Sequence, residues 1–585
     1  MKRRKALIWA FLLLSLIALI WILLRKPSPP CEPGAACPLE EFITIHHEDD
    51  NDTTDIIVQL YPELKEFPVL GERDTVFCFS PLLKVDASLD GPVTRNKVCL
   101  TKRDPLYARY LTGGTPLDTF ATGSKAFIED LNNFLYEDDV QRITEVIPAD
   151  TCRCDAAVFL LKAITPPGVD INSGIAAGTS GTTQDNTGAI LAAGFNYAIS
   201  LEPVNAAELV GYIQEMACPE VSKPTDGGRE EEELAQQDDS EDNPEPRPNE
   251  KCNPAVLHPQ SPLDGVTVAI VDTGMDPTYR YPNDLTGNLH SYFSFSTEIN
   301  ELTGPVEYSS HGEAWPGNGV DDGGDCFPDD YYGYDFFHDD NNPFDLQGHG
   351  SHIGHTVLTG DKFTSYPIRV MPLQFGGYRD GEFSCDLFAG ICAINYATNP
   401  DREVDIINLS WGFFSDIFHK VLYQQLLRAH DEDILVVTSA GNNEINTDDC
   451  RYWPARFSQI EPLNANVVSV AALDVFGPGD TPELAAYSNY GRMIDLAAPG
   501  TQIEGALVGS RDQFVPLDGT SMAAAVVSRR AAMLRRDGNT VVGGAAIKQL
   551  LLGAESEANK LCCTGDSRVL RRDRDQTLME AIGYE

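Results

Sequence analysis

Basic residues are scarce in this chain of 585 residues: 43 lysines and arginines stand against 88 aspartates and glutamates, a formal net charge of −45. A chain this acidic repels phosphate backbones, so we expect no nucleic acid partner. Cysteine is also sparse, because 14 residues in this length are too dilute for a small disulfide scaffold. Hydrophobic residues make up 42% and charged residues 22%, which excludes a wholly disordered or fibrous protein. The length suggests two to four domains of roughly 150 residues each.

The N-terminal segment lacks the cleavage site of a signal peptide. Residues 2–5 are basic, and the uncharged, mostly apolar residues 6–24 would form a helix of about 28 Å, close to the hydrocarbon thickness of a bilayer. Arg25, Lys26 and prolines follow instead of an A-x-A-like site. We therefore predict a cytoplasmic tail and a transmembrane signal anchor over 1–26; the alternative is secretion after signal cleavage. Four basic residues before the span and two after it place the N-terminus of a single-pass membrane protein in the cytoplasm and the rest outside, where disulfides persist.

Composition divides the remaining chain into four parts. Residues 27–40 are Pro-rich and predict a stalk. Residues 41–220 mix short apolar runs, such as 156–161 and 189–193, with turn signals and lack a chemical motif, which predicts an α+β-type N-terminal domain of unknown role. Residues 221–254 carry acidic runs that cannot bury apolar surface and predict a disordered linker to a domain over 255–585. Cys218 and Cys252 flank the acidic runs, and their pairing cannot be read from sequence.

The last part alternates strand-like and helix-like segments. Four β-branched runs have the pattern of buried strands: 266–271, 405–410, 434–440 and 467–472. Helix-like stretches lie between them at 387–397 and 418–430. This alternation predicts an α/β fold, a parallel sheet with helices on both faces. Ligands bind beyond the carboxyl ends of such strands, where Asp272 and Asn442 follow the first and third run.

Three short segments carry side chains suited to catalysis. Asp272 directly follows a buried strand and begins an Asp-Thr-Gly; the chain lacks a second Asp-Thr-Gly, so the carboxylate pair of an aspartic protease is missing. His349 lies between glycines, which suits a general base, although His349 and His352 could also form a metal pair. Ser521 follows Gly-Thr and precedes small helix formers, a pattern typical of a nucleophile at a helix start.

The chain order Asp, His, Ser is that of subtilisin. With it, residues from about 255 to the C-terminus resemble the subtilisin-like serine proteases, or subtilases. Further segments resemble family elements in order: 282–288, 318–336, 408–412, 439–442, 487–491 and 498–500. The chain departs from the family at Ala525, where proline is usual, and at 353–355, where the family usually has Val-Ala-Gly.

The resemblance implies a subtilisin-like sheet and a serine endopeptidase acting through an acyl-enzyme. Ser521 would be the nucleophile, His349 the general base, Asp272 its partner, and Asn442 with the Ser521 N–H the oxyanion hole. A further set of residues would form hydrogen bonds with the backbone of a polypeptide substrate or line its binding pocket: Ser410, Trp411, Gly412, Ala440, Gly441 and Gly381. Recognition through the substrate backbone favours broad specificity. The alternatives are a catalytically impaired subtilase that binds peptides, and an aspartic protease built on Asp272.

The resemblance also implies calcium and a propeptide. Nine aspartates lie in one segment: Asp321, Asp322, Asp325, Asp329, Asp330, Asp335, Asp339, Asp340 and Asp345. They repel one another unless a cation intervenes, and all-oxygen ligands select Ca²⁺; the alternative is a solvated acidic loop. Asp335, Asp340 and Asn342 match calcium-binding positions of some subtilases. Residues 41–220 could supply a propeptide that inhibits in cis.

Overall fold

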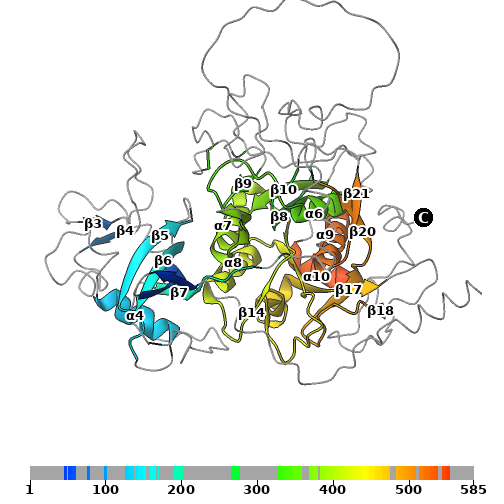
Figure 1. Cartoon of the computed structure of the whole chain (residues 1–585). Coiled ribbons are helices and arrows are strands. Elements are labelled where there is room, and N and C mark those ends of the chain that lie inside the picture. The colour runs from blue at the N-terminus through cyan, green and yellow to red at the C-terminus, as the bar shows by residue number, and fades with distance from the viewer. Residues whose placement is uncertain are drawn as a thin grey trace, which may run out of the picture.

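The structure of the protein is a computed structural model (Figure 1). It describes residues 45–48, 51–60, 76–79, 98–101, 125–136, 140–152, 158–166, 169, 190–199, 201, 265–276, 327–328, 330, 333–358, 368–379, 382–474, 483–508, 513–537 and 543–553. The predicted anchor, stalk and acidic linker lie outside these residues. Among the residues that are described, no helix is long and apolar enough to cross a membrane.

An eight-stranded sheet forms the centre of the C-terminal half, in the order β18-β17-β15-β13-β8-β10-β9, with β19 paired to β17. Its strands are β8 (Val266–Asp272), β9 (Tyr334–Asp335), β10 (Ile368–Gln374), β13 (Ile406–Leu409), β15 (Leu435–Ser439), β17 (Val467–Asp474), β18 (Glu483–Leu484) and β19 (Leu496–Pro499). All pairings are parallel except that of β17 with β18. The predicted parallel sheet is confirmed.

Helices cover both faces of this sheet. Alternate residues of each buried strand point to opposite faces, so each strand packs against helices on both sides. Val266, Val268 and Ile270 pack in one cluster with α6 (His349–Leu358), α9 (Thr520–Asp537) and α10 (Gly544–Gly553). Ala269 and Val271 belong to a second cluster with α7 (Leu387–Ala397) and α8 (Lys420–Asp431).

Shorter elements complete this half. They are the pairs β11 (Gly376–Arg379) with β12 (Glu382–Cys385), β14 (Phe413–Phe414) with β16 (Tyr452–Trp453), and β20 (Ile503–Ala506) with β21 (Phe514–Leu517), and the 3-10 helices η6 (Pro400–Arg402), η7 (Ala455–Gln459) and η8 (Leu463–Ala465).

The N-terminal region forms an antiparallel sheet of its own, in the order β1-β2-β6-β5 with β7 paired to β2. Its elements are β1 (Ile45–Glu48), β2 (Asn51–Leu60), the separate pair β3 (Val76–Phe79) and β4 (Val98–Thr101), α4 (Lys125–Leu135), β5 (Glu145–Thr151), β6 (Val158–Thr165) and β7 (Ile190–Phe195). We call residues 45–201 the N-terminal domain. It packs against α7 and α8, and its core is continuous with theirs (Figure 1).

Candidate active site

Asp272 and His349 form a hydrogen-bonded pair at the carboxyl end of β8. Nδ1 of His349 donates to Oδ1 of Asp272 over 2.7 Å, and both side chains are 0% exposed. Burial alone lowers the pKa of His349, but the charge and hydrogen bond of Asp272, helped by Asp345, outweigh it and raise the pKa above 6.5. This environment stabilises the imidazolium and leaves Nε2 as the basic nitrogen of the neutral ring.

A second buried carboxylate joins the end of β8 to the start of α6. Oδ1 of Asp345 accepts hydrogen bonds from Thr273 Oγ1 and from the N–H groups of Gln347 and Gly348, and Oδ2 accepts from the Ser351 N–H. Thr273 Oγ1 in turn accepts from the Gly350 N–H over 2.8 Å. These bonds fix the helix that carries His349 against the strand that carries Asp272.

Glycine is required where these two elements meet. A Cβ on Gly350 would lie 2.1 Å from the carbonyl oxygen of Gly274, too close for any side chain. Gly274 itself has a φ of +100°, which favours glycine. The glycine after His349 therefore allows the close approach of α6 to the loop after β8.

Ser521 lies at the start of α9 and is 7% exposed. Its Oγ donates to the carbonyl oxygen of Ser410 over 2.9 Å, and Ser410 Oγ donates back to the carbonyl oxygen of Ser521. Nε2 of His349 is buried and has no hydrogen-bond partner among the described residues. Ser521 Oγ is thus hydrogen-bonded to Ser410 and not to His349 in this structure. Catalytic hydrogen bonds commonly form only with substrate bound, so this geometry is compatible with a triad.

The Asn442 side chain has a defined orientation. Its Oδ1 accepts hydrogen bonds from the N–H and the Oγ1 of Thr520, each over 2.9 Å. With the oxygen engaged, Nδ2 is the remaining donor of the amide. Asn442 is thus hydrogen-bonded to the residue before Ser521. An oxyanion hole formed by the Asn442 side chain and the Ser521 N–H requires the two residues to be held together in this way.

The predicted substrate-binding residues have different surroundings. Trp411 is 1% exposed, and its indole donates to the Val271 carbonyl oxygen and packs on Phe375. The Gly441 N–H donates to Thr520 Oγ1, and Asn489 Nδ2 donates to the Ala440 carbonyl oxygen. Within the protein, these groups shape the turn that presents Asn442.

The other two predicted glycines can be placed only in part. A Cβ on Gly412 would lie 2.5 Å from the Trp453 carbonyl oxygen, so the glycine permits close packing beside Ser410. Gly381 lies outside the described residues. The substrate contacts of the whole set stay predictions.

The described aspartates of the acidic segment have partners within the protein. Asp330 is buried, pairs with Arg402 over 2.8 Å and accepts from the Tyr396 hydroxyl. Asp339 Oδ1 accepts from the Tyr334 hydroxyl. The interpretation as a wholly solvated loop is wrong for Asp330, Asp335 and Asp345, which are at most 1% exposed. Asp321, Asp322, Asp325 and Asp329 lie outside the described residues.

The predicted calcium ligands do not form a ready site. Asp335 Oδ1 accepts from the N–H groups of Phe337 and His338, and Oδ2 accepts from the His338 ring over 2.7 Å. Asp340 Oδ1 accepts from the Asn342 N–H. Within the described ranges, no three His, Cys, Asp or Glu side chains are grouped so as to hold a metal ion. In this structure the Asp335 and Asp340 carboxylates instead accept hydrogen bonds from the protein's own N–H groups and from the His338 ring.

His352 does not form a metal pair with His349. Its Nε2 donates to the carbonyl oxygens of Ile503 and Val515, at 2.9 and 3.1 Å. Burial, with the nearby His349, lowers the pKa of His352 to about 4, so the ring is neutral at pH 7. His352 is a structural residue that joins α6 to the β20–β21 pair.

Two positioning residues were missed by the sequence interpretation: Asp345, which was grouped with the calcium candidates, and Thr520. The available signal for Asp345 was its place four residues before His349. No sequence pattern points to the bond of Thr520 with Asn442, because the two residues lie 78 positions apart.

The family model described as the Subtilase family matches residues 264–577, more than half of the chain. Among curated proteins, the "Thermophilic serine proteinase" of Bacillus sp. (strain AK1) is 31% identical over 239 residues, 40% of this chain and 52% of that protein. The "Extracellular serine proteinase" of Thermus sp. (strain Rt41A) is 30% identical over 206 residues, 34% of this chain and 44% of that protein. The chain thus spans about half the length of the curated relatives it matches.

Among solved structures, a cold adapted subtilisin-like serine proteinase covers 52% of this chain and 90% of its own, with 20% sequence identity and a TM-score of 0.35. The matched residues include both Asp272 and His349. This chain belongs to the subtilase family.

Proposed function

We propose that the chain is a serine endopeptidase that uses Asp272, His349 and Ser521. The observation that carries the proposal is the fully buried 2.7 Å bond between His349 and Asp272, with the basic Nε2 left for a nucleophile. Ser521 at the start of α9 supplies the hydroxyl. Membership of the subtilase family supports the same assignment.

The steps follow from these groups. Ser521 Oγ attacks the peptide carbonyl carbon while its proton passes to His349 Nε2, and Asp272 stabilises the imidazolium. The oxyanion accepts hydrogen bonds from Asn442 Nδ2 and the Ser521 N–H. The C–N bond then breaks as His349 returns the proton to the leaving amine. Water repeats the sequence on the acyl-enzyme and restores Ser521.

A fluorophosphonate probe tests the proposal directly. The native protein should be labelled and should cleave denatured casein, whereas Ser521→Ala and heat-denatured protein should do neither. Asn442→Ala should fold and be labelled, but its kcat should fall by roughly 10²–10³, the range known for the equivalent loss in subtilisin. Equal inertness of native protein and Ser521→Ala would refute the peptidase.

The second candidate is a subtilase domain that binds peptides without cutting them. The bond from Ser521 Oγ to the Ser410 carbonyl oxygen favours it, because the hydroxyl proton is then engaged with Ser410. If this orientation persists with substrate, labelling of Ser521 fails while a casein peptide still binds. An aspartic protease would instead require inhibition by pepstatin.

Membrane attachment is a separate proposal, supported by the apolar residues 6–24 and their basic flanks. We propose a cytoplasmic N-terminus with the catalytic domain outside, and broad specificity for polypeptides. A reporter fused after residue 40 should be active outside the cytoplasm, and the protein should stay with membranes in carbonate. A soluble product that begins near residue 27 would show a cleaved signal instead.

Calcium binding remains a proposal from the family, and no catalytic step depends on it. A bound ion would stabilise the folded state by about 2.7 kcal/mol at a hundredfold excess over its Kd. Chelation at constant high salt should lower the Tm, and Asp340→Ala should reduce that response. An unmoved melting curve, with no tightly bound metal by elemental analysis, would exclude the ion.

A further inference from the structure

Helix α7 is enclosed on every side. All residues of Leu387–Ala397 are buried, and the sequence of the helix is apolar around its whole circumference except at Asn395. One side of α7 packs in a single core with Ala269 and Val271 of the central sheet, and that core also contains Ile57 and Phe195 of the N-terminal domain. A helix that is apolar all round requires cover on both sides. Without the N-terminal domain, α7 would expose an apolar surface.

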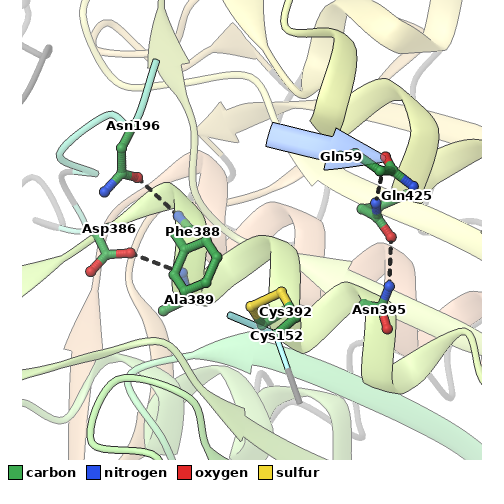
Figure 2. The surroundings of a disulfide bond; sticks show 9 residues. All are labelled: Gln59, Cys152, Asn196, Asp386, Phe388, Ala389, Cys392, Asn395 and Gln425. Carbon is green, nitrogen blue, oxygen red and sulfur yellow. Dashed lines mark hydrogen bonds between the residues drawn. A yellow bond between two sulfur atoms is a disulfide. The ribbon is translucent and has the colours of Figure 1, made fainter. Parts of the chain in front are cut away.

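The N-terminal domain also supplies hydrogen bonds that α7 cannot make itself. The Leu387 N–H donates to the Tyr197 carbonyl oxygen over 3.0 Å, and the Phe388 N–H donates to Asn196 Oδ1 over 2.9 Å. Only the next N–H group, that of Ala389, is capped by the helix's own Asp386 (Figure 2). The first turn of α7 is therefore shared between the two domains.

Polar side chains meet across the same interface. A buried chain of hydrogen bonds runs from Asn395 through Gln425 to Gln59 of the N-terminal domain, at 3.0 and 3.2 Å (Figure 2). His419, at the start of α8, donates from Nε2 to the Phe195 carbonyl oxygen. Separation of the domains would leave these buried groups without those partners, which is unfavourable for each group that stays buried.

A disulfide closes the interface. Cys152 and Cys392 are 2% and 6% exposed, and their bond joins the two domains across a sequence separation of 240 (Figure 2). Cys392 lies in the middle of α7, on the helix that the N-terminal domain covers. The disulfide is thus buried within the interface between the two domains.

We propose that the N-terminal domain is a permanent, covalently attached part of the mature protein. Cleavage of the chain between Leu201 and Gly265 yields two polypeptides that stay joined through Cys152–Cys392. A domain held in this way is not a propeptide that cleavage alone can release, because its release requires both reduction of the disulfide and separation of an apolar interface. This inference does not rest on the proposed peptidase activity.

The test uses the full-length protein with a recognition sequence for a site-specific protease inserted between residues 221 and 251. Cys218→Ser and Cys252→Ser form the background, because a bond between these cysteines would also hold the cleaved chains together. After cleavage and alkylation of free thiols, denaturing electrophoresis without reductant should show one species. Reductant should convert it into two. Two species without reductant would overturn the proposal.

The matched variant adds Cys152→Ser and Cys392→Ser to the same background. Its cleaved chains should separate in denaturant without reductant; if they stay together, another pair of cysteines is the tether and the assignment is wrong. Peptide mapping of the uncleaved natural protein gives an independent result, since it does not require the variants to fold. A linked peptide pair with Cys152 and Cys392 is expected, and a different partner for either cysteine would refute the inference.

Discussion

At the residue scale, the His349–Asp272 pair predicts an alkaline-shifted pH profile. In the proposed mechanism His349 must be neutral to accept the Ser521 proton, so activity should be lost as the pH falls through the pKa of His349. That pKa lies above the ordinary 6.5, because Asp272 outweighs burial. The profile of kcat/KM should therefore have its acid midpoint above pH 6.5. An acid midpoint at or below pH 6.5 would show that Asp272 does not raise the pKa of His349.

Asp345 is expected to position the base without contacting the reacting atoms. Asp345→Asn cannot accept all four hydrogen bonds, so α6 should shift relative to β8 and kcat/KM should fall on the order of tenfold, since small misplacements of catalytic groups are costly. The Asp345 charge also raises the pKa of His349, so the acid midpoint should move to lower pH. A loss of stability with an unchanged midpoint would indicate a purely structural role.

The sequence points to Asp272, His349, Ser521 and Asn442, because each lies in a short motif at a strand or helix end, and their catalytic roles stay predictions. It does not predict the state of Ser521, whose hydroxyl bonds to Ser410 of a different segment. It also cannot distinguish Asp345, buried among hydrogen-bond donors, from solvated aspartates nearby. Burial depends on how β8 and α6 pack, and that packing is not local in the chain.

At the scale of elements, residues of both domains cap the first turn of α7. We therefore expect comparable losses of stability when the capping side chain of either domain is removed. Asp386→Ala and Asn196→Ala should each lower the free energy of unfolding by about 1 kcal/mol, the usual cost of a lost N-cap. Urea unfolding measures both. Asp386→Asn is the matched control, because its side-chain oxygen can still accept from Ala389. No loss from Asn196→Ala would show that the interdomain cap does not stabilise α7.

Element prediction succeeded where the apolar pattern was unbroken. The helix predicted at 387–397 coincides with α7. The run at 266–271 differs from β8 by one residue at one end, and the run at 434–440 differs from β15 by one residue at each end. Strand β10 was missed, although it pairs with β8 along its whole length. Arg369 and Pro372 interrupt its apolar run; the arginine is accommodated by a hydrogen bond to Thr267, which only the fold reveals.

At the scale of the whole molecule, buried neutral histidines predict acid instability. Burial lowers the pKa of His352 and of His419 to about 4, and the unfolded chain binds their protons near pH 6.5. Their stabilising contribution is complete above pH 6.5 and is lost as the pH falls toward 4. Each contributes a slope of up to about 1.4 kcal/mol per pH unit in this window.

His352→Gln is the test, because it removes one titrating group from between α6 and the β20–β21 pair. The variant should be less stable at pH 8, yet its free energy of unfolding should depend less steeply on pH between 6.5 and 4. Denaturant titrations at several pH values measure the slope. A slope equal to that of the natural protein would show that His352 is not the acid-sensitive group.

Composition predicts a linker over 221–254, which lies outside the described residues, and it gives no sign of how the N-terminal domain joins α7. The sequence placed Cys152 beside Cys154 and offered no reason to pair it with Cys392, 240 residues away. Such pairing depends on the docking of the N-terminal sheet on α7. The apolar circumference of α7 was the one local sign that something covers it.

The place of α9 in the chain has a consequence for biosynthesis. This helix contacts α6 and the strands β8, β13, β15, β17 and β19, yet only α10 follows it among the described elements. A growing polypeptide therefore acquires Asp272, His349 and Asn442 long before the segment that carries Ser521. The strands that α9 covers are thus made before the helix, and the apolar face that they share with it stays uncovered until α9 has been synthesised.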